Sequence, residues 1–223
     1  MLYLFDIDGT LIGGDGAGRR AFEQACHDVL GVELALGGLR LDGMTDPLIL
    51  DHVFTTHLGR AATAEESATV LASYLRHLAP EVASSTAYKV HDAVFEVLEL
   101  LESREAIIGL ATGNLAEGAR IKLERSDLWR RFPFGGFGSD AAERAELVRV
   151  GIERGHAHAP QLGRRLEREE VIVIGDTPRD VSAAHAAGAV CVGVATGRFS
   201  VDELRASGAD AAYPTLREWM ATL

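Results

Sequence analysis

The chain of 223 residues is predicted to fold as an α/β protein, with a doubly wound parallel-sheet core and a helical cap domain inserted after the first strand. Three observations lead to this expectation. Short apolar runs recur along the chain, helical patterns separate most of them, and one long stretch near the N-terminus contains helical patterns alone. Strands that alternate with helices indicate βαβ crossovers and therefore a parallel sheet.

The expected strands are short and continuously apolar, which is typical of strands buried on both faces of a sheet. They are Leu2–Ile7, Ala106–Ala111, Val171–Ile174 and Val190–Val194. The expected helices of the same layer system are Asp92–Glu102, Leu115–Glu124, Arg144–Arg154 and Pro178–Ala187, with a closing helix at Leu216–Leu223. This alternation predicts a Rossmann-like core.

The stretch after the first strand has a different character. Its amphipathic helix patterns are Ala17–Leu30, Asp46–Leu58 and Glu65–Leu78. Glycines mark its beginning (Gly13, Gly14, Gly16, Gly18), and Pro80 with Ser84 and Ser85 marks its end. We therefore expect a core made of residues 1–12 and 86–223 and a helical cap made of residues 13–85.

Composition narrows the class of protein. Hydrophobic residues make up 47% of the chain, which is typical of a folded globular protein rather than a disordered one. The net charge of −11 disfavours nucleic acid and anionic membranes as partners, since both need clustered positive charge. Two cysteines, Cys26 and Cys191, cannot make a disulfide framework. No export signal and no apolar run of roughly 20 residues is present, so a cytoplasmic location is expected.

Polar residues follow three of the expected strands. The first strand leads into Asp6-Ile7-Asp8-Gly9-Thr10, the second into Thr112-Gly113-Asn114, and the third into Gly175-Asp176 with Asp180 shortly after. Ligands of parallel sheets bind beyond the carboxyl ends of the strands, so these side chains are expected to converge. Crowded carboxylates need a cation, and ligation by oxygen alone favours Mg²⁺, which indicates Mg²⁺-assisted phosphoryl chemistry.

These segments resemble the motifs of the haloacid dehalogenase-like (HAD) hydrolases. Asp6-Ile7-Asp8-Gly9-Thr10 looks like the first motif, and Thr112, Arg144 and the Gly175–Asp180 segment match the other three in order. The resemblance covers the whole chain, and the helical insert lies where that family places a cap. Within the family the chain is most similar to phosphoglycolate-phosphatase-like enzymes, a group of which Gly43-Met44-Thr45-Asp46 is also reminiscent.

The resemblance implies a role for each matching residue. Asp6 would be the nucleophile that forms an aspartyl-phosphate, and Asp8 would act as the general acid and base. The Mg²⁺ ligands would be Asp6, the backbone carbonyl of Asp8 and Asp176, with Asp180 in or near the same shell. The transferring phosphoryl group would be held by Thr112, Gly113, Asn114 and Arg144. The implied function is hydrolysis of a small phosphorylated metabolite, such as phosphoglycolate.

Two positions depart from the family pattern. The third-motif cation is commonly Lys, and here Arg144 takes its place, with Arg149 and Arg154 as alternatives. Arginine keeps its charge and can clamp phosphate with two hydrogen bonds, so the role is compatible with it. The Tyr-Pro-Gly that often precedes the second-motif helix is replaced by Tyr88-Lys89-Val90, which bears on the substrate more than on the reaction.

Several of these residues also have structural interpretations. Asp8-Gly9 is a turn signal, and Thr177 with Asp180 can form a capping box ahead of a helix. Asn114 with Glu117 could cap the helix that follows, and Arg144 alone would usually be a solvated helix charge. Their co-occurrence at strand ends, in one order, favours the functional interpretation.

Other functions stay open from the sequence. A sugar-phosphate mutase of the same superfamily is the first alternative, and a non-enzymatic phospho-acceptor or ligand-binding module is the second. The Gly14-x-Gly16-x-Gly18 segment fails the dinucleotide fingerprint because position 19 is Arg. The histidine pairs His52/His57 and His156/His158 lack the spacing of a zinc site. We further expect the cap to select the substrate, through Arg19, Arg20, Thr45 and Asp46.

Overall fold

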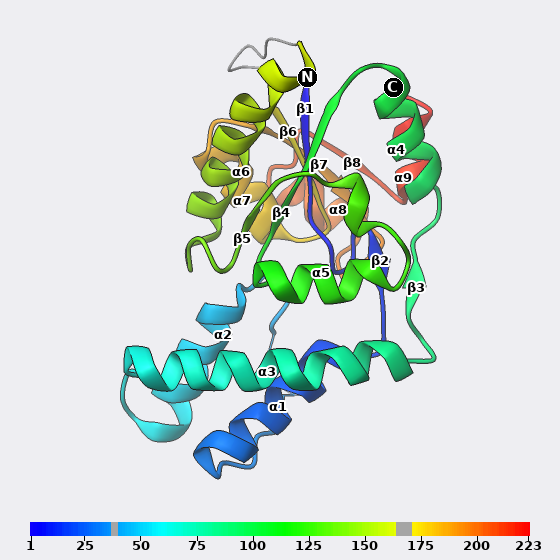
Figure 1. Ribbon diagram of the computed structural model, residues 1–223. Coiled ribbons are helices and arrows are strands. Elements are labelled where there is room, and N and C mark those ends of the chain that lie inside the picture. Colours follow the sequence, from blue (N-terminus) through cyan, green and yellow to red (C-terminus); the bar gives the residue numbers. More distant parts are fainter. Residues whose placement is uncertain (37–39, 164–170) are drawn as a thin grey trace.

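A six-stranded sheet forms the centre of the computed structural model, which describes residues 1–36, 40–163 and 171–223 (Figure 1). The strand order is β5-β4-β1-β6-β7-β8, and every neighbouring pair is parallel. The strands are β1 (Leu2–Phe5), β4 (Ile107–Thr112), β5 (Gly135–Phe137), β6 (Val171–Gly175), β7 (Val190–Val194) and β8 (Ala211–Tyr213). The predicted α/β class with a Rossmann-like core is confirmed.

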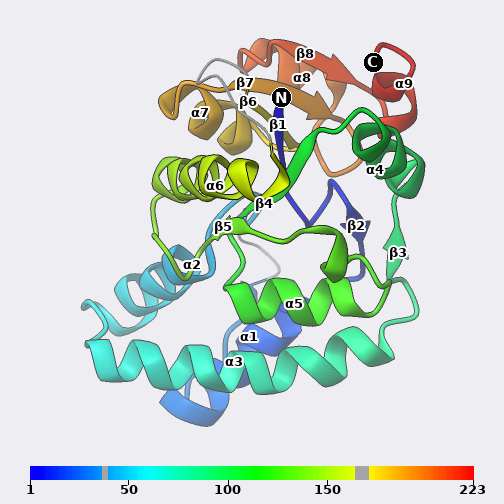
Figure 2. The same cartoon turned by 45° about the horizontal axis from the view of Figure 1, so that its top comes forward.

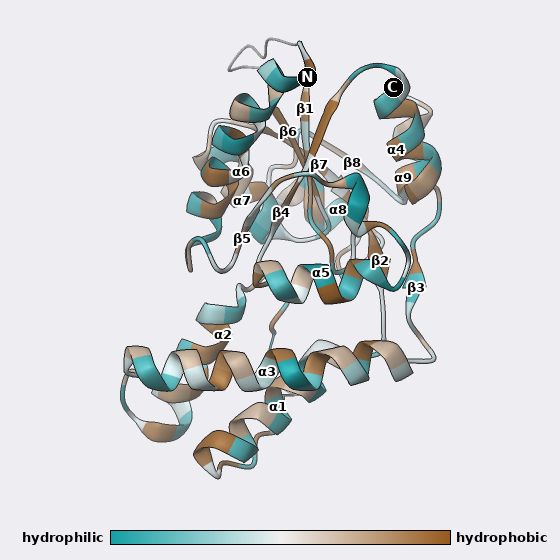
Figure 3. Cartoon of the chain, in the orientation of Figure 1, coloured by the Kyte–Doolittle hydropathy of each residue, from teal (hydrophilic) through white to brown (hydrophobic). Residues whose placement is uncertain are grey.

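Helices cover both faces of this sheet (Figure 2). They are α4 (Val94–Ser103), α5 (Ala116–Glu124) and α9 (Leu216–Met220) on one face, and α6 (Arg144–His158) and α7 (Pro178–Ala186) on the other. Successive side chains of β1 alternate between the two: Tyr3 and Phe5 pack toward the first group, Leu2 and Leu4 toward the second. Figure 3 shows apolar strands at the centre and hydrophilic residues on the outer helix faces.

The four predicted strands are present, and two more were not predicted. β5 and β8 are three-residue edge strands whose segments, Gly-Gly-Phe and Ala-Ala-Tyr, carry no Val or Ile run. A further antiparallel pair, β2 (Ile12–Gly13) and β3 (Lys89–Val90), lies where the chain leaves the core and returns to it. Short helical segments complete the chain at α8 (Val201–Ala206), η3 (Trp129–Arg131) and η4 (Ala159–Leu162).

The inserted helices are α1 (Ala17–Leu30), α2 (Asp46–Val53) and α3 (Ala64–Ser84), and they lie beyond the carboxyl ends of the strands (Figure 1). They share an apolar cluster that includes Phe22, Phe54 and Tyr74. The expected helix Asp46–Leu58 is helical over its whole length, but its last five residues form a π-helical segment (η2, Phe54–Leu58) rather than an α-helix. The division of the chain into domains at residues 13 and 85 stays a prediction.

Pro80 does not mark the end of the insert as expected, since α3 continues past it to Ser84. A proline inside a helix removes one backbone hydrogen bond. Burial of Val82 in the apolar cluster of the insert favours continuation of the helix in spite of that loss.

Both cysteines are free and buried, as expected. Among residues 1–36, 40–163 and 171–223, no helix combines the length and the apolar character that crossing a bilayer requires. The cytoplasmic location stays a prediction.

The contact between β5 and α6 allows a first test of the fold. A Cβ atom on Gly136 would lie 1.7 Å from the backbone oxygen of Leu147, so Gly136→Ala must displace α6. We expect the free energy of unfolding to fall by about 3 kcal/mol, or the Tm by roughly 10 °C. The control is Gly14→Ala, because nothing lies within 4 Å of the added atom there. Equal melting temperatures for both variants would contradict the packing described.

Candidate active site

The expected site residues meet at one edge of the sheet. Asp6 follows β1, Thr112 ends β4, and Asp176 follows β6. Because these strands are parallel, their carboxyl ends open on the same side, and the insert lies opposite them. The space between is a cavity of about 600 Å³ lined by residues of both parts. The predicted convergence of the strand ends therefore occurs in the structure.

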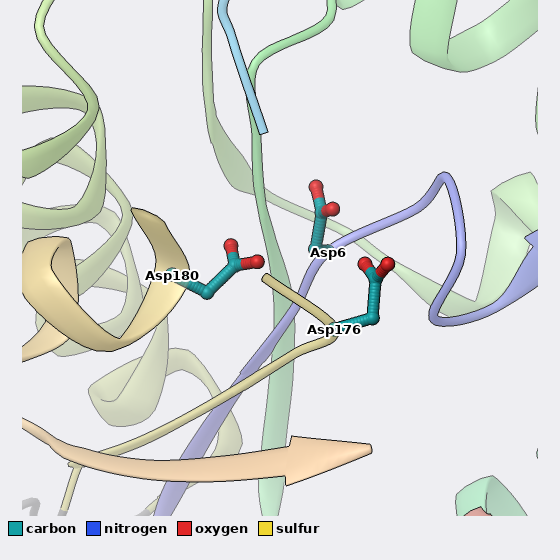
Figure 4. A group of neighbouring side chains, drawn as sticks. All are labelled: Asp6, Asp176 and Asp180. Atoms are coloured by element: carbon teal, nitrogen blue, oxygen red, sulfur yellow. The ribbon is translucent and has the colours of Figure 1, made fainter. Parts of the chain in front are cut away.

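Three buried carboxylates lie together at this edge of the sheet, and two of them, Asp6 and Asp176, line the cavity. Oxygens of Asp6, Asp176 and Asp180 lie within 4.8 Å of one another, and each residue is at most 4% exposed. Figure 4 shows the three side chains pointing toward a common space from β1, β6 and the first turn of α7. Burial, together with the negative charge of the neighbouring carboxylates, raises the pKa values of Asp6 and Asp176. A divalent cation would offset this repulsion.

Arg144 is the positive charge nearest these acids. It is the first residue of α6 and is only 7% exposed. Its Nη2 atom lies 2.9 Å from Oδ1 of Asp6, and its Nε donates to Oδ1 of Asp180 over 2.9 Å. The solvated-charge interpretation of Arg144 is therefore wrong. Arg149 and Arg154 lie elsewhere, paired with Glu146 and Asp140 respectively.

Asp180 combines the two roles considered from the sequence. Its Oδ2 accepts from the backbone N–H of Thr177, and the Thr177 hydroxyl accepts from the N–H of Asp180, which together make a capping box. Its Oδ1 accepts from Arg144. Both oxygens already have partners, so Asp180 orients Arg144 in this arrangement.

The carboxylate of Asp176 is held in a narrow space beside the first turn of the site. The Thr10 hydroxyl donates to its Oδ1 over 3.3 Å. Gly9 has a φ of +85°, and a Cβ there would lie 2.3 Å from Oδ2 of Asp176. The backbone N–H of Gly9 donates to the carbonyl of Ile12, so Asp8-Gly9 is a turn as well as part of the site.

Asp8 projects into the cavity and is held by two partners. The Asn114 amide and the Lys122 ammonium both donate to its Oδ2 over 2.7 Å. Partial removal from water raises the pKa of Asp8, but Lys122 and Asn114 outweigh this and lower it below its ordinary value. Asn114 also donates to the hydroxyl of Thr112 over 2.8 Å. The structural interpretation of Asn114 as a cap of the following helix is therefore wrong.

Lys122 was not predicted to belong to the site. It lies on α5, is 8% exposed, and donates to Oδ1 of Asn114 over 2.6 Å in addition to its contact with Asp8. Burial alone would lower the pKa of Lys122, yet the carboxylates of Asp8 and Asp46 raise it, so the charge is kept. The sequence contains one indication that Lys122 is buried. It follows Gly118 by four positions and Ala119 by three, so all three residues lie on the same, buried face of α5.

The loop of residues 43–46 in the insert is hydrogen-bonded to the core beside these residues. The Thr45 hydroxyl donates to the carbonyl of Ala142 over 2.8 Å, and Oδ2 of Asp46 accepts from the N–H of Leu115 over 2.8 Å. Arg144 reaches the same loop, donating from Nη1 to the carbonyl of Gly43 over 3.1 Å. Hydrogen bonds therefore join the insert to Arg144 and to the backbone of the core beside it.

The four insert residues expected near the substrate are placed differently from one another. Arg19 and Asp46 line the cavity. Thr45 is buried against the core, as described. Arg20 pairs with Asp15 and Glu81 on the outside of the insert.

The doubly wound sheet, the inserted helices and the acids at the strand ends are together the features of one class of hydrolases. The chain belongs to the haloacid dehalogenase-like hydrolase family, whose profile matches residues 3–194.

Relatives and a solved structure agree with this membership. The chain is 26% identical over 220 residues to the "Probable phosphatase IndB" of Dickeya dadantii, covering 97% of this chain and 90% of that protein. It is 28% identical over 228 residues to a phosphoglycolate phosphatase of Rhodospirillum rubrum, covering 97% and 89%. The crystal structure of a hydrolase from Pseudomonas syringae superposes with a TM-score of 0.73 at 22% identity, covering 100% and 99%.

Proposed function

We propose that the protein is a Mg²⁺-dependent phosphatase that hydrolyses a small organic phosphomonoester through an aspartyl-phosphate on Asp6. The observation that carries this proposal is the buried group of Asp6, Asp176 and Asp180 around Arg144, beside a cavity of about 600 Å³ that Asp6, Asp176 and Arg144 line. A cavity of this size suits a small metabolite. Membership of a hydrolase family and two relatives named as phosphatases support the same reaction.

The residues at the strand ends, with Arg144 and Lys122, each have a part in the proposed reaction. A carboxylate oxygen of Asp6 attacks phosphorus and the P–O bond to the alcohol breaks. Asp8, which is ionised at rest, takes a proton from the monoanionic phosphate ester and passes it to the departing oxygen. Asp8 then takes a proton from water, which attacks phosphorus and releases phosphate from Asp6. Arg144 orients Asp6 and, with Thr112 and the N–H of Gly113, binds the oxygens of the transferring group. Asn114 and Lys122 keep Asp8 in place between the two steps.

The acid cluster fits a divalent cation bound by oxygen. The ligands would be Asp6, Asp176 and the backbone carbonyl of Asp8, with Asp180 beside them. Oxygen ligands and a high local negative charge are the chemistry that Mg²⁺ prefers. When bound, the ion supplies positive charge that offsets the negative charge of the phosphoryl group and the carboxylates.

Metal dependence is the direct test of this proposal. We expect release of phosphate from para-nitrophenyl phosphate in the presence of Mg²⁺, a loss of about 10²-fold or more with EDTA, and recovery on adding excess Mg²⁺. We also expect Mg²⁺ to raise the Tm, because it binds only the folded acid cluster. Turnover that is undiminished after chelation, or absent with every divalent metal tried, would refute the proposal.

A further inference from the structure

We propose that Tyr74 and Lys122 form a subsite for a hydroxyl group of the substrate's alcohol part. The substrate would then be a phosphate monoester of a small hydroxylated alcohol rather than of a carboxylic acid or a plain alkyl alcohol. This inference rests on the proposed phosphatase function and specifies its substrate class. It concerns the space between α1, α3 and α5, on the insert side of Asp8.

Tyr74 is a buried residue of α3 that presents its hydroxyl to the cavity. It is only 2% exposed and lines the cavity, and its ring packs on Phe22 with a centroid distance of 5.2 Å. Within the described part of the chain its hydroxyl makes no hydrogen bond. Burial raises the pKa of Tyr74 well above its usual value, so the hydroxyl keeps its proton and can donate. The hydroxyl of a cavity-lining tyrosine that is not already bonded to the protein can bond a ligand there.

Lys122 faces the same space with one N–H to spare. An ammonium group has three donors, and two of them are used by Asp8 and Asn114. Gly18 of α1 shows where the two groups meet. The point at which a Cβ of residue 18 would lie is 3.6 Å from Nζ of Lys122 and 3.7 Å from the hydroxyl oxygen of Tyr74. Both donor groups therefore lie close to Gly18, and all three residues line the same cavity.

The subsite adjoins the position proposed for the departing alcohol. Lys122 contacts Oδ2 of Asp8, the group proposed to protonate the ester oxygen. A substrate whose ester oxygen lies against Asp8 therefore places its nearest carbons beside Lys122 and Tyr74. A polar atom there would be bound on the alcohol side of the phosphate, where it can contribute to specificity.

Charge decides which polar atom fits. The charged groups that interact with Lys122 are the carboxylates of Asp8, Asp46 and Asp6, so its single positive charge is already offset. Another carboxylate would meet net negative charge. A hydroxyl can accept from Tyr74 or Lys122 and donate to a neighbouring carboxylate, which satisfies every group without adding charge. The cations Arg19, Lys89 and Arg198 also line the cavity, but all three are exposed and are screened by solvent. The remaining cation of the lining, Arg144, is paired with Asp6 and Asp180.

The experiment compares three esters of similar length: 2-hydroxyethyl phosphate, 2-phosphoglycolate and propyl phosphate. We expect wild-type kcat/KM for 2-hydroxyethyl phosphate to exceed that for propyl phosphate by about tenfold, with 2-phosphoglycolate the poorest of the three. Tyr74→Phe should lower the hydroxyethyl-to-propyl ratio by about fivefold, the worth of one neutral hydrogen bond. Tyr213→Phe, which removes a hydroxyl bonded to Thr222 outside the cavity, should leave the ratio unchanged.

The ratio within one preparation does not depend on how much of the variant is folded, so partial loss of stability does not obscure the result. A preference for 2-phosphoglycolate, or a ratio that Tyr74→Phe does not change, would overturn the subsite and leave the phosphatase function standing. Failure of all three esters and of para-nitrophenyl phosphate with Mg²⁺ would overturn the proposed function itself, and the subsite with it.

Discussion

Replacing Asp6 with asparagine is expected to lower kcat by a factor of about 10⁴ or more, because the amide cannot form the acyl-phosphate on which the proposed reaction depends. The change keeps the size of the side chain and leaves an oxygen for the contact with Arg144. The phosphate assay with Mg²⁺ measures the loss. No labelled phosphate should remain on the protein after a brief reaction and denaturation, whereas the wild type should retain some.

The same variant should stay folded. Asp6 is one of three buried carboxylates, and its neutralisation removes the cost of burying that charge and relieves repulsion by Asp180, Asp8 and Asp176, which outweighs the lost attraction to Arg144. We therefore expect the Tm of Asp6→Asn in EDTA to be no lower than that of the wild type. The control is Asp92→Asn on the surface, which breaks an ion pair with Arg217 and should leave kcat unchanged. More than a tenth of wild-type turnover in Asp6→Asn would show that Asp6 is not the nucleophile.

The centre of the sheet could be predicted because its strands are buried on both faces. β1 and β4 lie inside the sheet, with helices above and below, so nearly every position is apolar and the runs are visible in the sequence. The edge strands β5 and β8 are three residues long and two of the three are Gly or Ala, so only their pairing to a neighbour defines them. Such pairing is a tertiary contact, which local patterns do not contain.

The acids of the site could be predicted for a related reason. Asp6 and Asp176 interrupt the chain where an apolar strand ends, and the parallel topology then brings the ends together. Arg144 was predicted through the resemblance alone, since on a helix between Glu143 and Glu146 it has the pattern of a solvated charge. Its burial follows from the approach of α6 to β1 and α7, which the sequence does not display.

Lys122 was missed because nothing in its local sequence distinguishes it from an ordinary lysine of a helix. Its neighbours along the chain are Ile121 and Leu123, and a lysine between them does not stand out. What separates it is a contact made across 114 residues, to Asp8. The position of Lys122 on the same helical face as Gly118 and Ala119 indicates that it is buried. This indication is useful only once the structure shows which face of the helix is buried.

Some residues of the site also hold the insert against the core through hydrogen bonds. Arg144 contacts Gly43, while Asp46 bonds the backbone that follows Asn114. Burial raises the pKa of Asp46 to about 6, although Lys122 and the N–H of Leu115 act against this. Residues of both the core and the insert therefore contribute to the position of Arg144 and to the charge around Lys122.

Replacing Arg144 with methionine is expected to reduce kcat/KM by about 10³-fold, because the transferring group loses a charged donor inside a buried site. Stability should fall as well. Arg144 is the countercharge of Asp6 and Asp180, and removing one partner of a buried ion pair typically costs about 3–5 kcal/mol. Thermal unfolding in EDTA measures this cost. Arg144→Lys keeps the charge and should restore part of both quantities, although a lysine cannot reach Asp6, Asp180 and Gly43 together.

Added Mg²⁺ distinguishes the electrostatic explanation from simple loss of packing. If the three acids bind the ion, Mg²⁺ should raise the Tm of Arg144→Met by more than that of the wild type, since the ion supplies charge that the variant lacks. Arg149→Met is the matched control: it lies on the same helix, pairs with the exposed Glu146, and should show wild-type activity and a wild-type response to Mg²⁺. An Arg144→Met protein that kept its activity, or whose Tm ignored Mg²⁺, would remove Arg144 from the anion site.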